Sequence, residues 1–87
     1  MPSAGKKSIT LLFFASTREM VGKNQESLEI PENWTLKDVK EHIFQSYPAL
    51  ASLKEFLVFS VNQNFFDENE QVPDNAEIAL IPPVSGG

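Results

Sequence analysis

The fold of this chain is constrained most by its single long amphipathic helix. The helix is predicted to start at Thr35, an N-cap residue type, with the acidic Asp38 in its first turn, and to end before Pro48. Its apolar residues recur at helical spacing and form one continuous stripe, consisting of Leu36, Val39, Ile43, Phe44 and Tyr47. One stripe of this length can cover only one face of a small sheet.

The apolar run at residues 9–14, Ile-Thr-Leu-Leu-Phe-Phe, predicts a strand with large side chains on both faces. Alternation places Ile9, Leu11 and Phe13 on one face, and Leu12 and Phe14 on the other. Because one helix layer covers only one of these faces, the second keeps exposed apolar groups. A partner protein is one way to cover them.

Four further runs complete the predicted sheet: residues 27–30, 56–61, 65–66 (a brief edge strand) and 77–81. In the last run Ala79 and Ile81 share a face. A short helix is predicted between the first two strands, because Ser16 and Glu19 have capping-box spacing and Gly22 can end it.

This element order predicts an α+β fold, a β-grasp with a mixed sheet of about five strands covered on one face by one main helix. Since the helix crosses over between the two halves, the first and last strands are expected to pair in parallel at the centre of the sheet. The predicted organisation is a flexible arm at residues 1–7, one domain at 8–81, and an extended tail at 82–87.

The tail reads Pro82-Pro83-Val84-Ser85-Gly86-Gly87. Two prolines cannot continue a ladder of backbone hydrogen bonds, and they favour a stiff, extended exit from the last strand. Six extended residues span about 20 Å. Because Gly86 and Gly87 have no Cβ, this end could enter a narrow channel in another protein.

Composition excludes several classes of function. The net charge of −5 and the pI of about 4.7 argue against nucleic acid binding. The 87 residues include no cysteine, so the chain has neither a thiol nucleophile nor a cysteine metal site. No run resembles a membrane span and no signal-peptide pattern is visible, which predicts a cytoplasmic protein that does not bind membranes.

Side chains that could perform catalysis are scarce. The single histidine, His42, is expected on the helix surface, and the acidic residues Asp67, Glu68 and Glu70 lack the spacing of a calcium-binding loop. We therefore expect no catalysis by this chain alone. The reactive group would be the Gly87 carboxylate, which could attack the α-phosphate of ATP if an enzyme holds both. A sulfur or nitrogen nucleophile could then displace AMP from the acyl adenylate.

Three segments, residues 12–22 (LFFASTREMVG), Val61-Asn62-Gln63 and Ile81 to Gly87, together resemble the small subunit of molybdopterin synthase, a ubiquitin-like sulfur carrier. The resemblance spans nearly the whole chain after the N-terminal arm. It implies a ubiquitin-like β-grasp fold and no bound cofactor. One departure is Ile81, where relatives often carry an aromatic residue.

The resemblance also implies partners and site residues. A ubiquitin-activating-type adenylyltransferase and sulfurtransferase, which consumes ATP, would convert Gly87 to a thiocarboxylate. The tail, Pro82, Pro83, Val84, Ser85 and Gly86, would then enter the large subunit, in a heterotetramer of two small and two large subunits, to donate sulfur to cyclic pyranopterin monophosphate. Phe14, Phe65 and Ile81 would form the apolar patch against the large subunit, with core burial the alternative for Phe65.

Three other functions stay open on the sequence. The chain could carry sulfur for another pathway, such as thiamine synthesis or tRNA thiolation, or it could be a ubiquitin-like modifier joined to lysines. It could also be a simple binding domain with an incidental tail.

Overall fold

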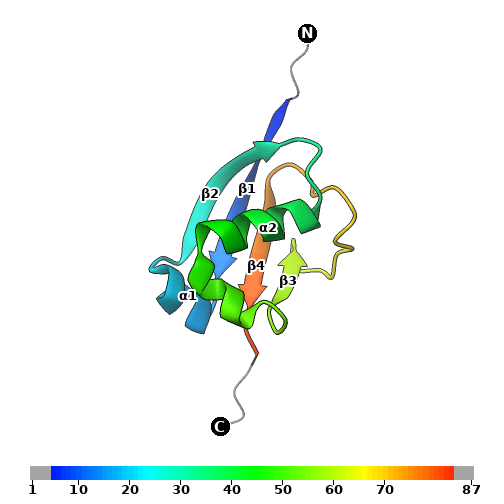
Figure 1. The fold of residues 1–87 in the computed structure, drawn as a ribbon. Coiled ribbons are helices and arrows are strands. Elements are labelled where there is room, and N and C mark those ends of the chain that lie inside the picture. Colours follow the sequence, from blue (N-terminus) through cyan, green and yellow to red (C-terminus); the bar gives the residue numbers. More distant parts are fainter. Residues whose placement is uncertain (1–4, 84–87) are drawn as a thin grey trace.

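The computed structural model describes residues 5–83, which form one sheet with helices between its strands. Figure 1 shows the arrangement. In chain order the elements are β1 (Lys6–Phe13), α1 (Ser16–Val21), β2 (Gln25–Pro31), α2 (Leu36–Ser46), the 3₁₀ helix η1 (Pro48–Leu53), β3 (Val58–Val61) and β4 (Ala76–Ile81).

The sheet has the order β2-β1-β4-β3, with the first and last strands at its centre. β1 and β4 are parallel, whereas β1 pairs with β2 and β3 pairs with β4 in antiparallel fashion. The predicted α+β class and the parallel central pair are therefore confirmed. Among residues 5–83 the sheet has four strands rather than about five, because Phe65 and Phe66 form no strand after the turn that follows β3.

The core lies between the sheet and α2, which crosses one face of the sheet (Figure 1). β1 contributes Ile9, Leu11 and Phe13, as the alternation predicted, and all three are buried. Leu36, Val39 and Ile43 of the predicted helical stripe are buried as well, while Phe44 and Tyr47 pack against the core and are half-buried. Side-chain burial on one face of the sheet and one stripe of the helix is the main stabilising contribution to this fold.

The predicted start of α2 is confirmed in detail. The Thr35 hydroxyl accepts a hydrogen bond from the Asp38 backbone N–H at 3.3 Å, and the Asp38 carboxylate accepts one from the Thr35 N–H at 2.9 Å. These two bonds form a reciprocal capping box. The helix ends at Ser46, before Pro48, as predicted.

The predicted capping box of α1 is wrong, although the helix and its end at Gly22 are confirmed. Ala15, not Ser16, precedes the helix, and no side chain caps it. Ser16 is already helical because the chain turns out of β1 at Ala15, which has a positive φ of 52°. The Thr17 hydroxyl donates a hydrogen bond to the Phe14 carbonyl at 2.6 Å and braces this turn instead.

The sheet begins earlier than predicted. Lys6 and Lys7, assigned to a flexible arm, belong to β1 and lie opposite Pro31 and Ile30 of β2. Lys7 is buried, and its amine donates to the Val72 carbonyl and, at 3.4 Å, to that of Trp34. Burial lowers the pKa of this amine, an effect that nearby carboxylates oppose. The apolar stem of the Lys7 side chain can thus be buried while its amine forms hydrogen bonds to two loop carbonyls.

No helix within residues 5–83 has the length and apolar character needed to cross a membrane.

The Tyr47 hydroxyl, which donates to the Glu26 carboxylate, generates a prediction about stability and pH. This hydrogen bond, followed by burial, raises the pKa of Tyr47 above its usual value of 10.0. The stability that the bond contributes is therefore fully present below pH 10 and is lost as the pH rises through the folded-state value. Tyr47→Phe should cost about 1 kcal/mol at pH 7.5, measured by urea unfolding, and the difference from wild type should shrink above pH 10. A difference that stayed constant with pH would contradict this account.

Candidate functional site

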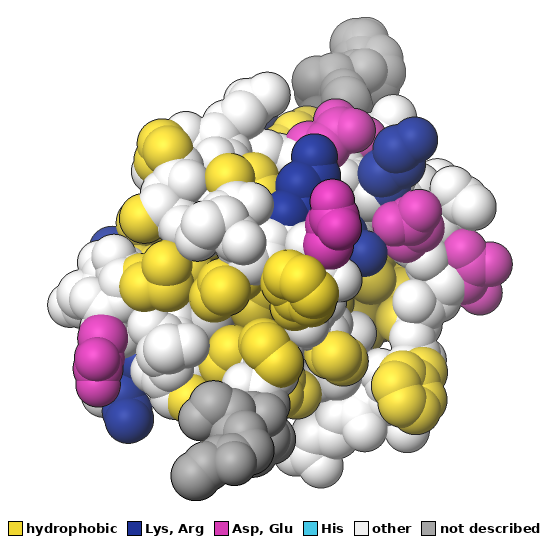
Figure 2. Space-filling view, turned by 60° about the horizontal axis from the view of Figure 1, so that its bottom comes forward, with side chains coloured by type: hydrophobic (Ala, Val, Ile, Leu, Met, Phe, Trp, Pro, Cys, Tyr) yellow, Lys and Arg dark blue, Asp and Glu magenta, His cyan; other side chains and the backbone are white. Residues whose placement is uncertain are grey.

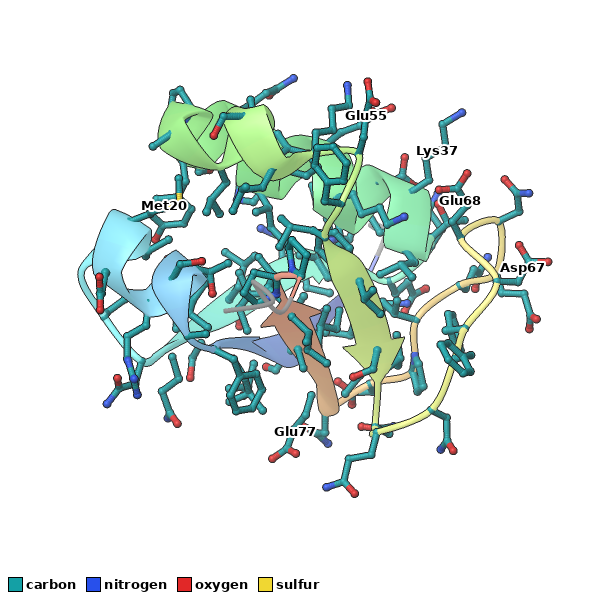
Figure 3. The ribbon with its side chains drawn as sticks, turned by 90° about the horizontal axis from the view of Figure 1, so that it is seen from below. Met20, Lys37, Glu55, Asp67, Glu68 and Glu77 are labelled. Carbon is teal, nitrogen blue, oxygen red and sulfur yellow. The ribbon has the colours of Figure 1, made fainter. Side chains whose placement is uncertain are left out.

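A shallow hollow of about 690 Å³ lies on the sheet face opposite α2. β1 and the residue after it supply Leu12 and Phe14, β3 supplies Val58 and Ser60, β4 supplies Glu77, Ala79 and Ile81, and the segment after β3 supplies Gln63, Asn64 and Phe65. Figure 3, seen from below, shows the helices on one side of the sheet and Glu77 on the other. The hollow is the face that the single helix layer leaves uncovered.

The strand register explains why these side chains meet. Leu12 lies beside Ala79, and Ala79 lies beside Ser60, so one row of the open face crosses three strands. In the next row Ile81 lies beside Val58, and the Phe14 backbone N–H donates to the Leu80 carbonyl at 3.3 Å. Residues of one row share a face because neighbouring strands are pleated in phase.

Large apolar side chains are concentrated here. Among residues 5–83 six large hydrophobic side chains are exposed, and four of them line the hollow: Phe14 (47% exposed), Val58 (45%), Phe65 (91%) and Ile81 (39%). The predicted exposure of Phe14 on an uncovered face is confirmed, and Ile81 shares that face. Core burial of Phe65 is excluded, since its side chain is almost fully accessible. Exposed apolar surface of this kind usually marks an interaction site.

Sequence reasoning missed Val58 and the turn residues Gln63 and Asn64. The sequence contained a signal for Val58, because it alternates with the apolar residues Leu57, Phe59 and Val61. The structure buries these three residues and turns Val58 outward. The apolar run at residues 56–61 predicts one strand, but β3 begins only at Val58. For the turn residues the sequence predicted the turn and gave no indication of which surface it borders.

The hollow lies where β4 ends. β4 finishes at Ile81, as the two prolines predicted, and Pro82 is buried while Pro83 is exposed. Figure 2 shows hydrophobic side chains gathered on the end of the molecule where β1 and β4 finish. The other predicted site residues, Val84, Ser85, Gly86 and Gly87, lie outside the described residues. Pro82 and Pro83 therefore follow directly after Ile81, which belongs to the row of side chains on the open face.

Glu77 is the one ionisable residue that lines the hollow, and among residues 5–83 it forms no salt bridge. The acidic residues Asp67 and Glu68 lie on the loop between β3 and β4, away from Glu77 (Figure 3). Glu68 pairs with Lys40 at 3.2 Å. Within the described part of the chain no three His, Cys, Asp or Glu residues are grouped closely enough to hold a metal ion.

A second hollow, of about 550 Å³, lies beside α2 and differs in character. Its lining mixes lysines with glutamates, and Lys40 lies over the Phe59 ring, with its amine 5.0 Å from the ring centroid. His42 is half-buried on the same helix, 5.8 Å from the Trp34 ring. The second hollow and His42 lie on the α2 side of the sheet, whereas the apolar hollow lies on the open face and includes Ile81 at the end of β4, so the apolar hollow is the candidate site.

Comparison with known proteins supports a family assignment. The model of the ThiS family matches residues 11–87. The molybdopterin synthase sulfur carrier subunit of Chlamydomonas reinhardtii is 36% identical over 81 residues, covering 91% of this chain and 98% of that protein. The sulfur carrier subunit from Haemophilus influenzae is 38% identical over 81 residues, covering 91% and 99%.

Two solved structures share the fold. A complex of subunits 1 and 2 of the molybdopterin-converting factor from Helicobacter pylori contains a chain that is 27% identical, with a TM-score of 0.64, covering 92% of this chain and 99% of that one. Ubiquitin from Caldiarchaeum subterraneum is 19% identical, with a TM-score of 0.65, covering 95% and 100%. The predicted ubiquitin-like β-grasp is thereby confirmed.

The contrast between exposed and buried phenylalanines predicts different stability effects. Phe65→Ala removes a side chain that is already in water and should change the free energy of unfolding by no more than about 0.5 kcal/mol. Phe13→Ala, in the core on the other face of the sheet, should cost about 3–5 kcal/mol. Urea unfolding of both variants tests this, and a large loss for Phe65→Ala would mean that its ring is buried in solution.

Proposed function

Because the chain belongs to the ThiS family, and within it to the molybdopterin synthase sulfur carrier subunits, we propose that it carries sulfur as a thiocarboxylate on Gly87 for molybdenum cofactor synthesis. The acceptor is cyclic pyranopterin monophosphate. The observation that carries this proposal is the apolar hollow at the end of β4, from which the chain continues through two prolines to Gly86 and Gly87.

The hollow supplies the docking surface for the large subunit of molybdopterin synthase. Phe14, Phe65 and Ile81 present apolar area that loses contact with water on binding, which is the main source of affinity in such interfaces. The Helicobacter pylori complex of subunits 1 and 2 supports a partner of this kind. In the assembly of two small and two large subunits, the tail from Pro82 to Gly86 enters the large subunit.

The Gly87 carboxylate is activated by a separate ATP-consuming enzyme. A carboxylate oxygen attacks the α-phosphate of ATP and pyrophosphate leaves, which gives an acyl adenylate. Sulfide supplied with that enzyme then attacks the acyl carbon, AMP leaves, and the product is the thiocarboxylate. The chain has no cysteine, so the terminal acyl group is the place where it can hold sulfur covalently.

In the large subunit the thiocarboxylate sulfur attacks a carbon of the substrate and displaces an oxygen substituent from that carbon. Water then cleaves the acyl–sulfur bond and restores the carboxylate. Two such transfers supply the two sulfurs of the dithiolene. We assign the catalytic side chains to the large subunit. His42 lies on α2, on the side of the sheet opposite the hollow, and so is poorly placed to assist.

Removal of Gly87 tests the chemical step. After incubation with ATP, the activating enzyme and a sulfur source, intact mass spectrometry of the wild-type chain should show one oxygen replaced by sulfur. The chain lacking Gly87 should show no such change, because the reactive carboxylate no longer reaches the same position. It should keep its unfolding midpoint and bind the large subunit nearly as well.

Two outcomes would contradict the proposal. Molybdopterin formation with the truncated chain would mean that Gly87 is not the sulfur carrier group. An isopeptide-linked adduct of the wild-type chain, in place of the sulfur product, would identify a protein modifier instead.

A second experiment tests the docking surface with a matched pair of exposed phenylalanines. Phe65→Ala should weaken binding to the large subunit at least about tenfold, because it removes an apolar anchor from the interface. Phe56→Ala serves as the control, since Phe56 is 61% exposed and does not line the hollow. Isothermal titration calorimetry measures both, and equal losses would place the docking surface elsewhere.

A further inference from the structure

We propose that Asn62 is the positioning residue of the docking surface. Asn62 attaches the turn after β3 to strand β4. This attachment holds Phe65 at the rim of the hollow in a position ready for the partner. This inference rests on the function proposed above.

The turn after β3 has an uncommon backbone. Asn62 and Gln63 both have positive φ, 52° and 69°, although neither is glycine. Val61 and Asn64 flank them and exchange two backbone hydrogen bonds, of 2.9 Å and 3.0 Å. Two central residues with positive φ form the type I′ turn that suits the twist of paired strands. Asparagine tolerates this conformation, whereas for glutamine it is strained.

Asn62 ties the strained turn to the neighbouring strand. Its backbone N–H donates to the Glu77 carbonyl at 2.8 Å, and its side-chain Oδ1 accepts from the Glu77 N–H at 2.9 Å. Its own carbonyl accepts from the Asn64 side chain at 3.0 Å. Because β4 lies at the centre of the sheet and pairs on both sides, Glu77 is a firm anchor for the turn.

Phe65 depends on this anchor because little else holds it. Its side chain is 91% exposed, so packing contributes little to its position. The residue belongs to no strand, and it directly follows Asn64. Gln63, Asn64 and Phe65 all line the hollow, and the turn is thus one wall of the docking surface. Holding this wall in place before binding reduces the entropy that is lost when the partner docks.

A double-mutant cycle on binding to the large subunit tests the inference. Asn62→Ala should weaken binding about three- to tenfold in the wild-type background, because the wall must then be ordered on binding. In the Phe65→Ala background the same change should cost little more, since Asn62 acts through Phe65. Amide exchange at Asn64, whose N–H bonds to Val61, should also accelerate in Asn62→Ala.

Thr35→Ala is the matched control for a general loss of stability. It removes the cap of α2, on the other side of the sheet, and should lower the ratio of folded to unfolded protein about fivefold without changing the affinity. If Asn62→Ala folds poorly, Asn62→Gly keeps the positive φ accessible and removes only the side-chain bond to Glu77. The same loss of affinity is expected.

Additive effects of Asn62→Ala and Phe65→Ala would overturn the inference, as would an unchanged affinity in both Asn62 variants. If Phe65→Ala alone still weakens binding, the proposed docking surface remains supported and only the role of Asn62 is wrong. If Phe65→Ala does not weaken binding, the docking surface and the role of Asn62 are both wrong.

Discussion

The parallel pairing of β1 with β4 is the constraint on which the rest of the molecule depends. Parallel neighbours finish at the same end of a sheet, so Phe14 after β1 and Ile81 at the end of β4 come together. The crossover that makes this pairing possible contains α2, which takes up one face of the sheet. The other face is left open at the point where the chain passes from Ile81 into Pro82.

The floor of the proposed docking surface and its most exposed side chain lie on different parts of the structure. Leu12, Ala79 and Ile81 lie on central strands that are held by hydrogen bonds on both sides, so this floor of the hollow is rigid. Phe65 lies on a segment outside the sheet and relies on the Asn62 turn for its position. Apolar contact gives affinity but little directional information. Under the proposed function, the orientation of the partner then depends on the fixed shape of the hollow and on Glu77, its one charged residue.

Sequence reasoning succeeded where local pattern and long-range packing agree. The stripe of α2 and the alternation in β1 each match one buried face, and Thr35, three residues before Asp38, is the expected N-cap. The same spacing at Ser16 and Glu19 predicted a capping box that does not form, because the path of the chain out of β1 places Ser16 inside the helix. Two adjacent phenylalanines carry no periodicity, so the absence of a strand there was not predictable from pattern, and the exposure of Phe65 was expected only from the family resemblance. Lys7 falls in the predicted flexible arm, because its burial depends on loop carbonyls far along the chain that local pattern does not reveal.

A carrier that works through one tail must release each partner as well as bind it. The activating enzyme and the large subunit both require Gly87, so under the proposed function they bind one at a time. A shallow hollow with four exposed apolar side chains offers limited buried area, which suits an interface that forms and dissolves repeatedly. The positioning of Phe65 by Asn62 adds affinity without adding area, since it lowers the entropic cost of docking. Under the proposed function, the turn at Asn62 thus helps to set how long the tail stays in the large subunit.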